Sequence, residues 1–328
     1  MAREIVLERF GAPEVFQERT VPDTAPARGE LRIRQKAIGV NFTDVHGRRG
    51  DYPDLFALPK PLVLGMEAAG VVEAVGEGVS GFKVGDRVAY ASRPLGAYRD
   101  VRNFPAERCV VLPQGISDTI AAAALLKGLT VQTLIRRVFR VEAGMPVVVH
   151  SAAGGVGQMA GQWLRALGAQ GIGIVGSEAK VAAAKAAGYS EVFVLGDGDW
   201  AAKVREATGG AGVPVVYDPV GATTWEGSLA CLAPRGFLVC FGNSSGLVPP
   251  FQINGLRDRG SLRLSWVRFS DYTADAAELR EAAKDLFEVL GAGRIQPAAP
   301  RTLPLSQAAE AHRLLESRAT TGTLVLVP

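Results

Sequence analysis

The chain has 328 residues, of which 48% are hydrophobic and 21% charged, and Lys plus Arg outnumber Asp plus Glu by only 36 to 33. A single hydrophobic core typically holds roughly 100 to 200 residues, so the length predicts two domains. The charge is balanced and no run of like charges stands out, so neither nucleic acid nor a membrane surface is an expected partner.

The N-terminus and the cysteines indicate the compartment. The N-terminus leads directly into strand-like sequence with no apolar core or cleavage site, so no export signal is expected. The longest apolar stretches are taken as too short to span a bilayer. Three widely spaced cysteines, Cys109, Cys231 and Cys240, suit neither a disulfide framework nor a zinc cluster. We therefore expect a cytoplasmic protein with buried thiols.

The first third of the chain predicts a β-rich domain. Up to about residue 111, short alternating segments such as 31–40 and 70–75 are separated by Gly and Pro turns. The segment 113–117 then opens the first helical stretch and supplies its N-cap.

From about residue 145 the pattern changes to strand, glycine turn and helix in repetition. Strands are expected at 147–150, 172–175, 192–195, 213–218, 237–241 and 262–266, and helices at 156–167, 178–187, 199–208, 223–232 and 274–290. This alternation predicts a parallel sheet covered by helices. A short strand after residue 294, a helix at 306–317 and a strand at 323–327 break the repeat, and we expect them to return to the first domain.

The sharpest local signal is the segment 147–157, in which an apolar strand runs into a glycine turn that opens a helix. Its small residues Ala152, Gly154 and Gly157 match A-x-G-x-x-G, the fingerprint of a dinucleotide-binding turn. Small residues permit the tight turn and the close approach of a pyrophosphate, and the helix N-terminus offers N–H groups to the phosphates. We expect a dinucleotide here.

The end of the next strand indicates which dinucleotide. An NAD site usually places an acid there for the ribose 2′-hydroxyl, but this strand ends in Gly176 and Ser177, with Lys180 shortly after. A charge-assisted contact from Lys180 to a 2′-phosphate would contribute roughly 1.5 to 3 kcal/mol. NADPH is therefore favoured over NADH, although Lys180 as a solvated helix lysine remains open.

Three other motifs carry less weight. His150 closes an apolar strand and is expected to be an interior histidine, and His312 has no metal-ligand partner at a suitable spacing. The segment 242–246 formally matches the G-x-S-x-G elbow of hydrolases, but Pro249 and Pro250 follow where that elbow requires a helix. We therefore set a hydrolase aside.

Together, the segments 37–44, 64–70, 126–130, 151–157, 241–246 and 316–320 resemble the zinc-free, zeta-crystallin-like NADPH:quinone oxidoreductases of the medium-chain dehydrogenase/reductase superfamily, almost end to end. The resemblance implies an α/β protein. Residues 1–123 and 297–328 would form a GroES-like β-rich catalytic domain, and residues 124–296 a Rossmann domain with a doubly wound parallel sheet that binds NADPH. The family commonly forms homodimers, so a homodimer is expected.

The resemblance also implies a reaction without metal. Alcohol dehydrogenases of the superfamily place a zinc-binding Cys where this chain has Asn41 and a zinc-binding His where it has Met66. Neither an amide nor a thioether suits catalytic zinc, and the four-cysteine cluster of structural zinc is missing. Hydride transfer from NADPH to a quinone is the expected reaction.

By resemblance, Asn41, Asp44 and Tyr52 line the nicotinamide and substrate pocket and are expected catalytic residues. The Asn41 amide or the Tyr52 hydroxyl is a candidate hydrogen-bond donor to the acceptor oxygen, on which negative charge grows. His46 is a fourth candidate, as a proton donor. The residues expected to bind the cofactor are Asn41, Thr130, Ala152, Ala153, Gly154, Gly155, Val156, Gly157, Gly176, Ser177, Lys180, Phe241, Gly242, Asn243, Ser244 and Arg318.

Three positions depart from the family pattern, and two other functions stay open. Leu195 replaces a Tyr often found beside the 2′-phosphate, His46 replaces a pocket Tyr, and Trp266 and Val267 replace an Arg-Pro pair. The alternatives are NADPH-dependent reduction of an enone, alkenal or enoyl thioester, and an NADPH-binding structural or RNA-binding protein with little turnover.

Overall fold

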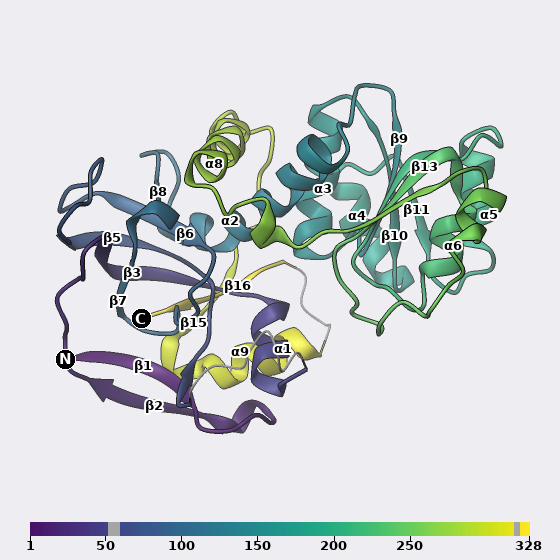
Figure 1. Ribbon diagram of the computed structural model, residues 1–328. Coiled ribbons are helices and arrows are strands. Elements are labelled where there is room, and N and C mark those ends of the chain that lie inside the picture. Colours follow the sequence, from purple (N-terminus) through teal and green to yellow (C-terminus); the bar gives the residue numbers. More distant parts are fainter. Residues whose placement is uncertain (52–59, 318–321) are drawn as a thin grey trace. The chain divides into compact units, whose positions relative to one another are not determined.

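The computed structural model describes residues 1–51, 60–317 and 322–328, and it contains two compact units (Figure 1). The first unit comprises residues 1–126, 273–291 and 297–328, and the second comprises residues 127–272 and 292–296. The domain bounds expected above, 1–123 with 297–328 and 124–296, stay a prediction.

Antiparallel strands dominate the described part of the first unit. One sheet has the order β2-β1-β4, and a larger one has the order β15-β16-β3-β5-β6-β8, with β7 also paired to β3. The strands are β1 (Ala2–Leu7), β2 (Phe16–Val21), β3 (Glu30–Val40), β4 (Leu62–Val63), β5 (Glu67–Val75), β6 (Arg87–Ala91), β7 (Val101–Pro105), β8 (Val110–Val111), β15 (Arg301–Pro304) and β16 (Leu324–Val327). Since β16 pairs with β3, the C-terminal segment does return to the first unit, as expected.

The expectation that the first helix comes only after residue 111 was wrong, because α1 (Phe42–Arg49) follows β3 directly. The Asp44 carboxylate accepts the backbone N–H of Asn41 at 2.9 Å and so caps the start of this helix. Gly50, at φ 78°, ends it in the left-handed conformation. Two longer helices, α8 (Ala276–Gly291) and α9 (Ala308–Glu316), also belong to this unit.

Helix α2 (Asp118–Gln132) continues into a π-helical turn, Thr133–Val138, and the chain passes along it from the first unit into the second. The Ser117 hydroxyl accepts the N–H of Ile120 at 3.2 Å, which confirms the predicted N-cap. These 21 helical residues are long and apolar enough to cross a bilayer, which corrects the expectation that no stretch was. Because most of this apolar stretch is buried inside the protein, a core helix accounts for that composition.

The second unit contains the predicted parallel sheet, with the strand order β11-β10-β9-β12-β13-β14. Its strands are β9 (Pro146–His150), β10 (Gln170–Val175), β11 (Glu191–Val194), β12 (Val213–Asp218), β13 (Leu232–Cys240) and β14 (Arg263–Trp266). The order reverses between β9 and β12, and ligands of such sheets bind beyond the carboxyl ends of the strands at this switch point.

Helices cover both faces of this sheet (Figure 1). Helices α3 (Gly155–Ala166) and α4 (Val181–Ala186) lie on one face, and α5 (Trp200–Ala207) and α6 (Trp225–Ala230) lie on the other. The strands between them carry continuous apolar runs, such as Val147 to Val149, because both of their faces are buried.

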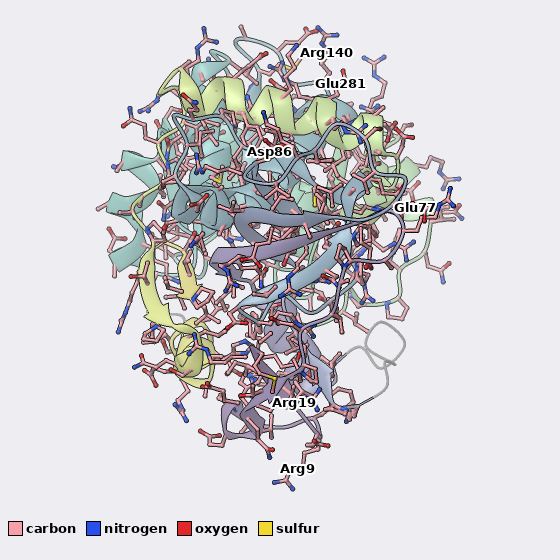
Figure 2. All side chains as sticks on the ribbon, turned by 90° about the vertical axis from the view of Figure 1, so that its left-hand side faces the viewer. Arg9, Arg19, Glu77, Asp86, Arg140 and Glu281 are labelled. Atoms are coloured by element: carbon pink, nitrogen blue, oxygen red, sulfur yellow. The ribbon has the colours of Figure 1, made fainter. Side chains whose placement is uncertain are left out.

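Charged side chains of both signs lie on the surface, as Figure 2 shows for Arg9 and Glu77, which point outward from the first unit. Both are exposed. This mixture is consistent with the balanced charge of the sequence.

Candidate active site

The turn after β9 has the geometry of a phosphate-binding turn. Ser151 adopts φ 54°, and Gly154 is the N-cap of α3, which therefore has no side-chain cap. The first bond of the helix joins the Gln158 N–H to the Gly154 carbonyl at 2.8 Å. The three amides before it, at residues 155–157, have no acceptor within the helix and are the N-terminal groups that bind anions.

Close packing explains why this turn needs small residues. A Cβ on Gly157 would lie 2.7 Å from the Ala152 Cα and still closer to the Ser151 carbonyl oxygen. A Cβ on Gly173, in β10, would lie 2.8 Å from the Ala152 Cβ. The Ala152 N–H bonds the Ile174 carbonyl at 3.1 Å. The turn is thus held tightly between α3 and β10.

The carboxyl end of β10 is open. Gly176 and Ser177 are exposed, and a Cβ on Gly176 would meet nothing within 4 Å. Lys180 is half-buried at the end of the 3-10 turn Glu178–Lys180, and the acid nearest in sequence, Glu178, is exposed. Within the described residues no ion pair engages Lys180.

A buried carboxylate holds the loop that follows β12. Asp218 is 1% exposed and accepts the N–H groups of Val220 and Gly221 at 2.7 and 3.2 Å. It also accepts the Ser228 hydroxyl at 2.8 Å, and the same Ser228 oxygen lies 2.9 Å from the His150 Nε2. His150 is 1% exposed, which confirms that this residue is an interior histidine, and burial lowers its pKa.

The segment after β13, from Phe241 to Gly246, packs on that loop. The Ser244 N–H bonds the Pro219 carbonyl at 3.2 Å, and a Cβ on Gly242 would lie 2.8 Å from the same oxygen. No helix follows at once, since the next helix is α7 (Asn254–Asp258), so the elbow of a hydrolase is absent from this segment. This segment follows the carboxyl end of β13, so it lies at the same edge of the sheet as the glycine turn. The residues concerned are Phe241, Gly242, Asn243 and Ser244.

In the first unit, Asn41 connects β3 to α1 and contacts a fully buried acid. The Asn41 Nδ2 donates to the Glu67 Oε2 at 2.9 Å, and the Glu67 Oε1 accepts the backbone N–H of Leu126 at 2.6 Å. Glu67 is 0% exposed and Asn41 only 7%. A Cβ on Gly39 would overlap this carboxylate, so glycine is required there.

Asp44 receives a chain of directed hydrogen bonds. The Arg48 guanidinium can only donate, so the His312 Nδ1, 3.3 Å from the Arg48 Nε, accepts. A neutral His312 then carries its proton on Nε2, which lies 2.9 Å from the Tyr98 hydroxyl, and that hydroxyl donates to the Asp44 Oδ2 at 3.3 Å. Burial, reinforced by Arg48, lowers the pKa of His312 to about 3, and burial together with Asp44 raises that of Tyr98.

His46 lies half-buried on α1, with its Nδ1 2.7 Å from the Asp51 Oδ2. Asn41, Asp44 and His46 therefore share one short helix and its cap. Two predicted site residues, Tyr52 and Arg318, lie outside the described residues.

The predicted site residues thus form one group in each unit. Asn41, Asp44 and His46 gather at α1 in the first unit, and Thr130, half-buried on α2, belongs to the second. The second unit also brings the glycine turn, Gly176, Ser177, Lys180 and residues 241–244 to the carboxyl end of the sheet. The sequence analysis did not single out Glu67 or Asp218 as site residues. Only Asp218 carried a sequence signal, since it stands at the end of a predicted strand.

No three His, Cys, Asp or Glu residues among those described are grouped so that they could hold a metal ion. Asn41 and Met66 stand at the two positions for which the family resemblance implied zinc ligands in alcohol dehydrogenases. The amide of Asn41 is engaged with Glu67 instead.

Comparisons with known proteins agree with both units. Residues 27–116 match the alcohol dehydrogenase GroES-like domain, and residues 155–284 match the zinc-binding dehydrogenase domain. Quinone oxidoreductase 1 of Escherichia coli is 43% identical over 330 residues, covering 100% of both chains. The chain belongs to the quinone oxidoreductase family of the medium-chain dehydrogenase/reductase superfamily.

Members of the quinone oxidoreductase family and their relatives also share the fold. The structure of the E. coli quinone oxidoreductase complexed with NADPH matches with a TM-score of 0.95 at 43% identity, covering 99% of this chain and 100% of that one. A 2-haloacrylate reductase of Burkholderia is 39% identical over 331 residues, covering 100% of this chain and 99% of the relative. The expected pairing of a GroES-like domain with a Rossmann domain is confirmed.

Proposed function

We propose that this chain reduces quinones by hydride transfer from NADPH, as a homodimer in the cytoplasm. The observation that carries the proposal is the uncapped N-terminus of α3 behind a turn too tight for larger residues, in a chain similar throughout to a quinone oxidoreductase solved with NADPH. This turn fits the diphosphate of a dinucleotide.

The residues at the second unit's sheet edge fit the rest of the nucleotide. The backbone amides of residues 155–157 would hold the diphosphate, against the turn formed by residues 152–154. Lys180 and Ser177 would bind the 2′-phosphate, and the family pattern adds Arg318. A Cβ on Gly176 would meet nothing within 4 Å, so the end of β10 has room for this group. Phe241 to Ser244 and Thr130 would bind toward the nicotinamide.

NADPH, when bound, supplies the hydride, so the protein has to orient two flat rings and exclude water. Asn41, Asp44, Tyr52 and His46 are the proposed catalytic group. Asp44 caps α1 and thereby positions Asn41 and His46. His46, whose Nδ1 is paired to Asp51, would deliver the proton that the reduced oxygen needs.

Steady-state oxidation of NADPH and NADH with 1,4-benzoquinone and 9,10-phenanthrenequinone tests the proposal. We expect turnover with NADPH, a weaker response to NADH, and no loss of rate after dialysis against EDTA. A purified protein that does not bind NADPH, or that requires added zinc, would contradict the proposal.

The second candidate is reduction of an activated alkene, which the 39% identical 2-haloacrylate reductase favours. Its substrate also accepts hydride at a polarised double bond. Adding an alkenal, an enone and 2-chloroacrylate to the panel distinguishes the two by their kcat/KM. Tight NADPH binding without oxidation by any acceptor would instead favour the structural alternative.

A homodimer is supported by the second unit. Strand β14 ends the sheet order, so its outer edge has no partner strand among the described residues. The same unit exposes large apolar side chains at Leu247, Phe251, Ile253 and Trp266. Exposed edges and apolar surfaces of this kind are commonly covered by a partner.

A further inference from the structure

Asp218 is a buried charged side chain at the carboxyl end of β12, and the proposed function gives it no role. Its Oδ1 accepts the backbone N–H groups of Val220 and Gly221 at 2.7 and 3.2 Å. Its Oδ2 accepts the hydroxyls of Thr224 and Ser228 at 2.7 and 2.8 Å. Four donors therefore hold the carboxylate in place, and through Oδ1 the carboxylate holds the start of the loop that follows β12.

The segment 241–246 is hydrogen-bonded to that loop along its backbone. Two of its N–H groups, those of Ser244 and Ser245, bond carbonyls of the loop at 3.2 and 2.8 Å. In the opposite direction, the Ala222 N–H of the loop bonds the Gly246 carbonyl at 3.2 Å. Since the segment lies between β13 and α7, these bonds to the loop support a stretch of backbone that belongs to neither a helix nor a strand.

The loop and the segment are also closely packed. Gly221 adopts φ 89°, and a Cβ there would lie 2.5 Å from the Gly246 carbonyl oxygen. A Cβ on Gly242 would lie 2.8 Å from the Pro219 carbonyl oxygen. The two stretches of backbone are thus in contact near both ends of the segment, so a shift of the loop must move the segment as well.

We infer that Asp218 is a positioning residue for the nicotinamide half of NADPH, which acts through the loop 219–222 on the segment 241–246. The inference rests on the proposed function, because it assumes that residues 241–244 bind toward the nicotinamide. The adenosine half is proposed to bind at other elements of the same unit, the end of β10 and the turn 151–157. That turn has its own support, since the Ala152 N–H bonds the Ile174 carbonyl. Loss of the carboxylate should therefore weaken the binding of one half only.

Replacement of Asp218 tests the role of its Oδ1 as an acceptor. Asp218→Ala removes every acceptor, whereas Asp218→Asn keeps an amide oxygen that can accept the same two backbone N–H groups. Asn and Asp both bond backbone groups a few residues ahead, and Ser does so more weakly. We expect the Kd for NADPH to rise by about tenfold in Asp218→Ala, the value of one or two hydrogen bonds. The rise should be smaller in Asp218→Ser and less than about twofold in Asp218→Asn.

Adenosine 2′,5′-bisphosphate is the probe that separates positioning from a general loss of stability. It carries the adenine and the 2′-phosphate of NADPH but no nicotinamide half, so its Kd should keep the wild-type value in all three variants. The matched control is Val204→Ala, which removes buried volume from α5 of the same unit. It should lower the melting temperature and leave both dissociation constants unchanged.

Calorimetric titration of all five proteins with both ligands, together with their melting temperatures, decides the inference. A raised Kd for NADPH alone in Asp218→Ala, restored in Asp218→Asn, supports it. If the alanine variant does not fold, the serine variant carries the same test. A wild-type ratio of the two dissociation constants in either folded variant, or an equal loss in Asp218→Asn, overturns the inference and leaves the proposed function standing. A wild-type protein that does not bind NADPH overturns both.

Discussion

Among the residues that the structure describes, Lys180 is the cation that we propose to favour NADPH over NADH. It follows the open end of β10, where Gly176 and Ser177 replace the acid of an NAD site. We predict that Lys180→Ala raises the Kd for NADPH by about tenfold to a hundredfold, the value of one charge-assisted hydrogen bond, and leaves that for NADH nearly unchanged. Fluorescence titration with both nucleotides measures this. The control is Lys185→Ala, an exposed lysine of α4; an unchanged NADPH-to-NADH ratio in Lys180→Ala would refute the role.

His46 tests a different step, the delivery of a proton. Its Nδ1 lies 2.7 Å from the Asp51 Oδ2, so the ring is held by a carboxylate while it serves as the proposed proton donor. We predict that His46→Ala lowers kcat by about a hundredfold, the lower end for general acid catalysis. The measurement is the steady-state kcat with NADPH and 1,4-benzoquinone. A variant with the wild-type kcat would show that His46 only lines the pocket.

At the scale of elements, the tight contact between the turn and α3 should be intolerant of a single methyl group. A Cβ on Gly157 would lie 2.7 Å from the Ala152 Cα. We therefore predict that Gly157→Ala costs about 1 to 3 kcal/mol of unfolding free energy and weakens NADPH binding at least tenfold. Urea unfolding and NADPH titration measure the two effects.

The matched control is Gly255→Ala in α7. A Cβ there meets nothing within 4 Å, and alanine favours a helix by up to about 1 kcal/mol. Equal stability and nucleotide affinity in the two variants would show that the turn is looser than described.

The chain from Arg48 through His312 to Asp44 links α9 to α1 and should be sensitive to acid. Burial holds the pKa of His312 at about 3, whereas in the unfolded chain a histidine titrates near 6.5. Between these values the unfolded state binds the extra proton, so unfolding becomes easier as the pH falls. We predict that this residue alone accounts for about 1 to 2 kcal/mol of the stability lost between pH 7 and pH 5.

The variant His312→Gln isolates that contribution. It keeps a neutral hydrogen-bonding side chain and should be less stable than wild type at pH 7, yet lose less stability on going to pH 5. Urea unfolding at both pH values gives the two slopes. Identical slopes would mean that His312 titrates normally in the folded protein.

At the scale of the whole molecule, the proposed dimer depends on the exposed edge of β14. Trp266 is 52% exposed there, and a lysine on an edge strand opposes pairing with another chain. We predict that Trp266→Lys shifts the protein toward a monomer, as measured by size-exclusion chromatography with light scattering. The control Val84→Lys replaces an exposed apolar residue of the first unit and should leave the mass unchanged. A wild-type monomer would contradict the dimer itself.

Much of the second unit could be predicted from sequence because its signals are local. Each strand of the sheet is a short apolar run, and the turn at 151–157 is predicted by the spacing of its glycines within a few residues. Helix α1 was missed for the opposite reason. Its eight residues include aromatic and β-branched side chains, and its start is stabilised by Asp44 and a partner, Tyr98, that lies 54 residues away.

The sequence by itself determined the alternation of strands and helices and the absence of an acid at the end of β10, which are properties of residue type and short spacing. Its resemblance to the superfamily implied that Asn41 and Met66 stand at the zinc-ligand positions. Only the tertiary structure decided that Asn41 meets Glu67 across 26 positions, and that Arg48 meets His312 across 264. Such contacts depend on which sheets and helices the long loops bring together. Burial removes water from each polar group, so the group must bond a protein partner, and no local sequence pattern encodes which partner that is.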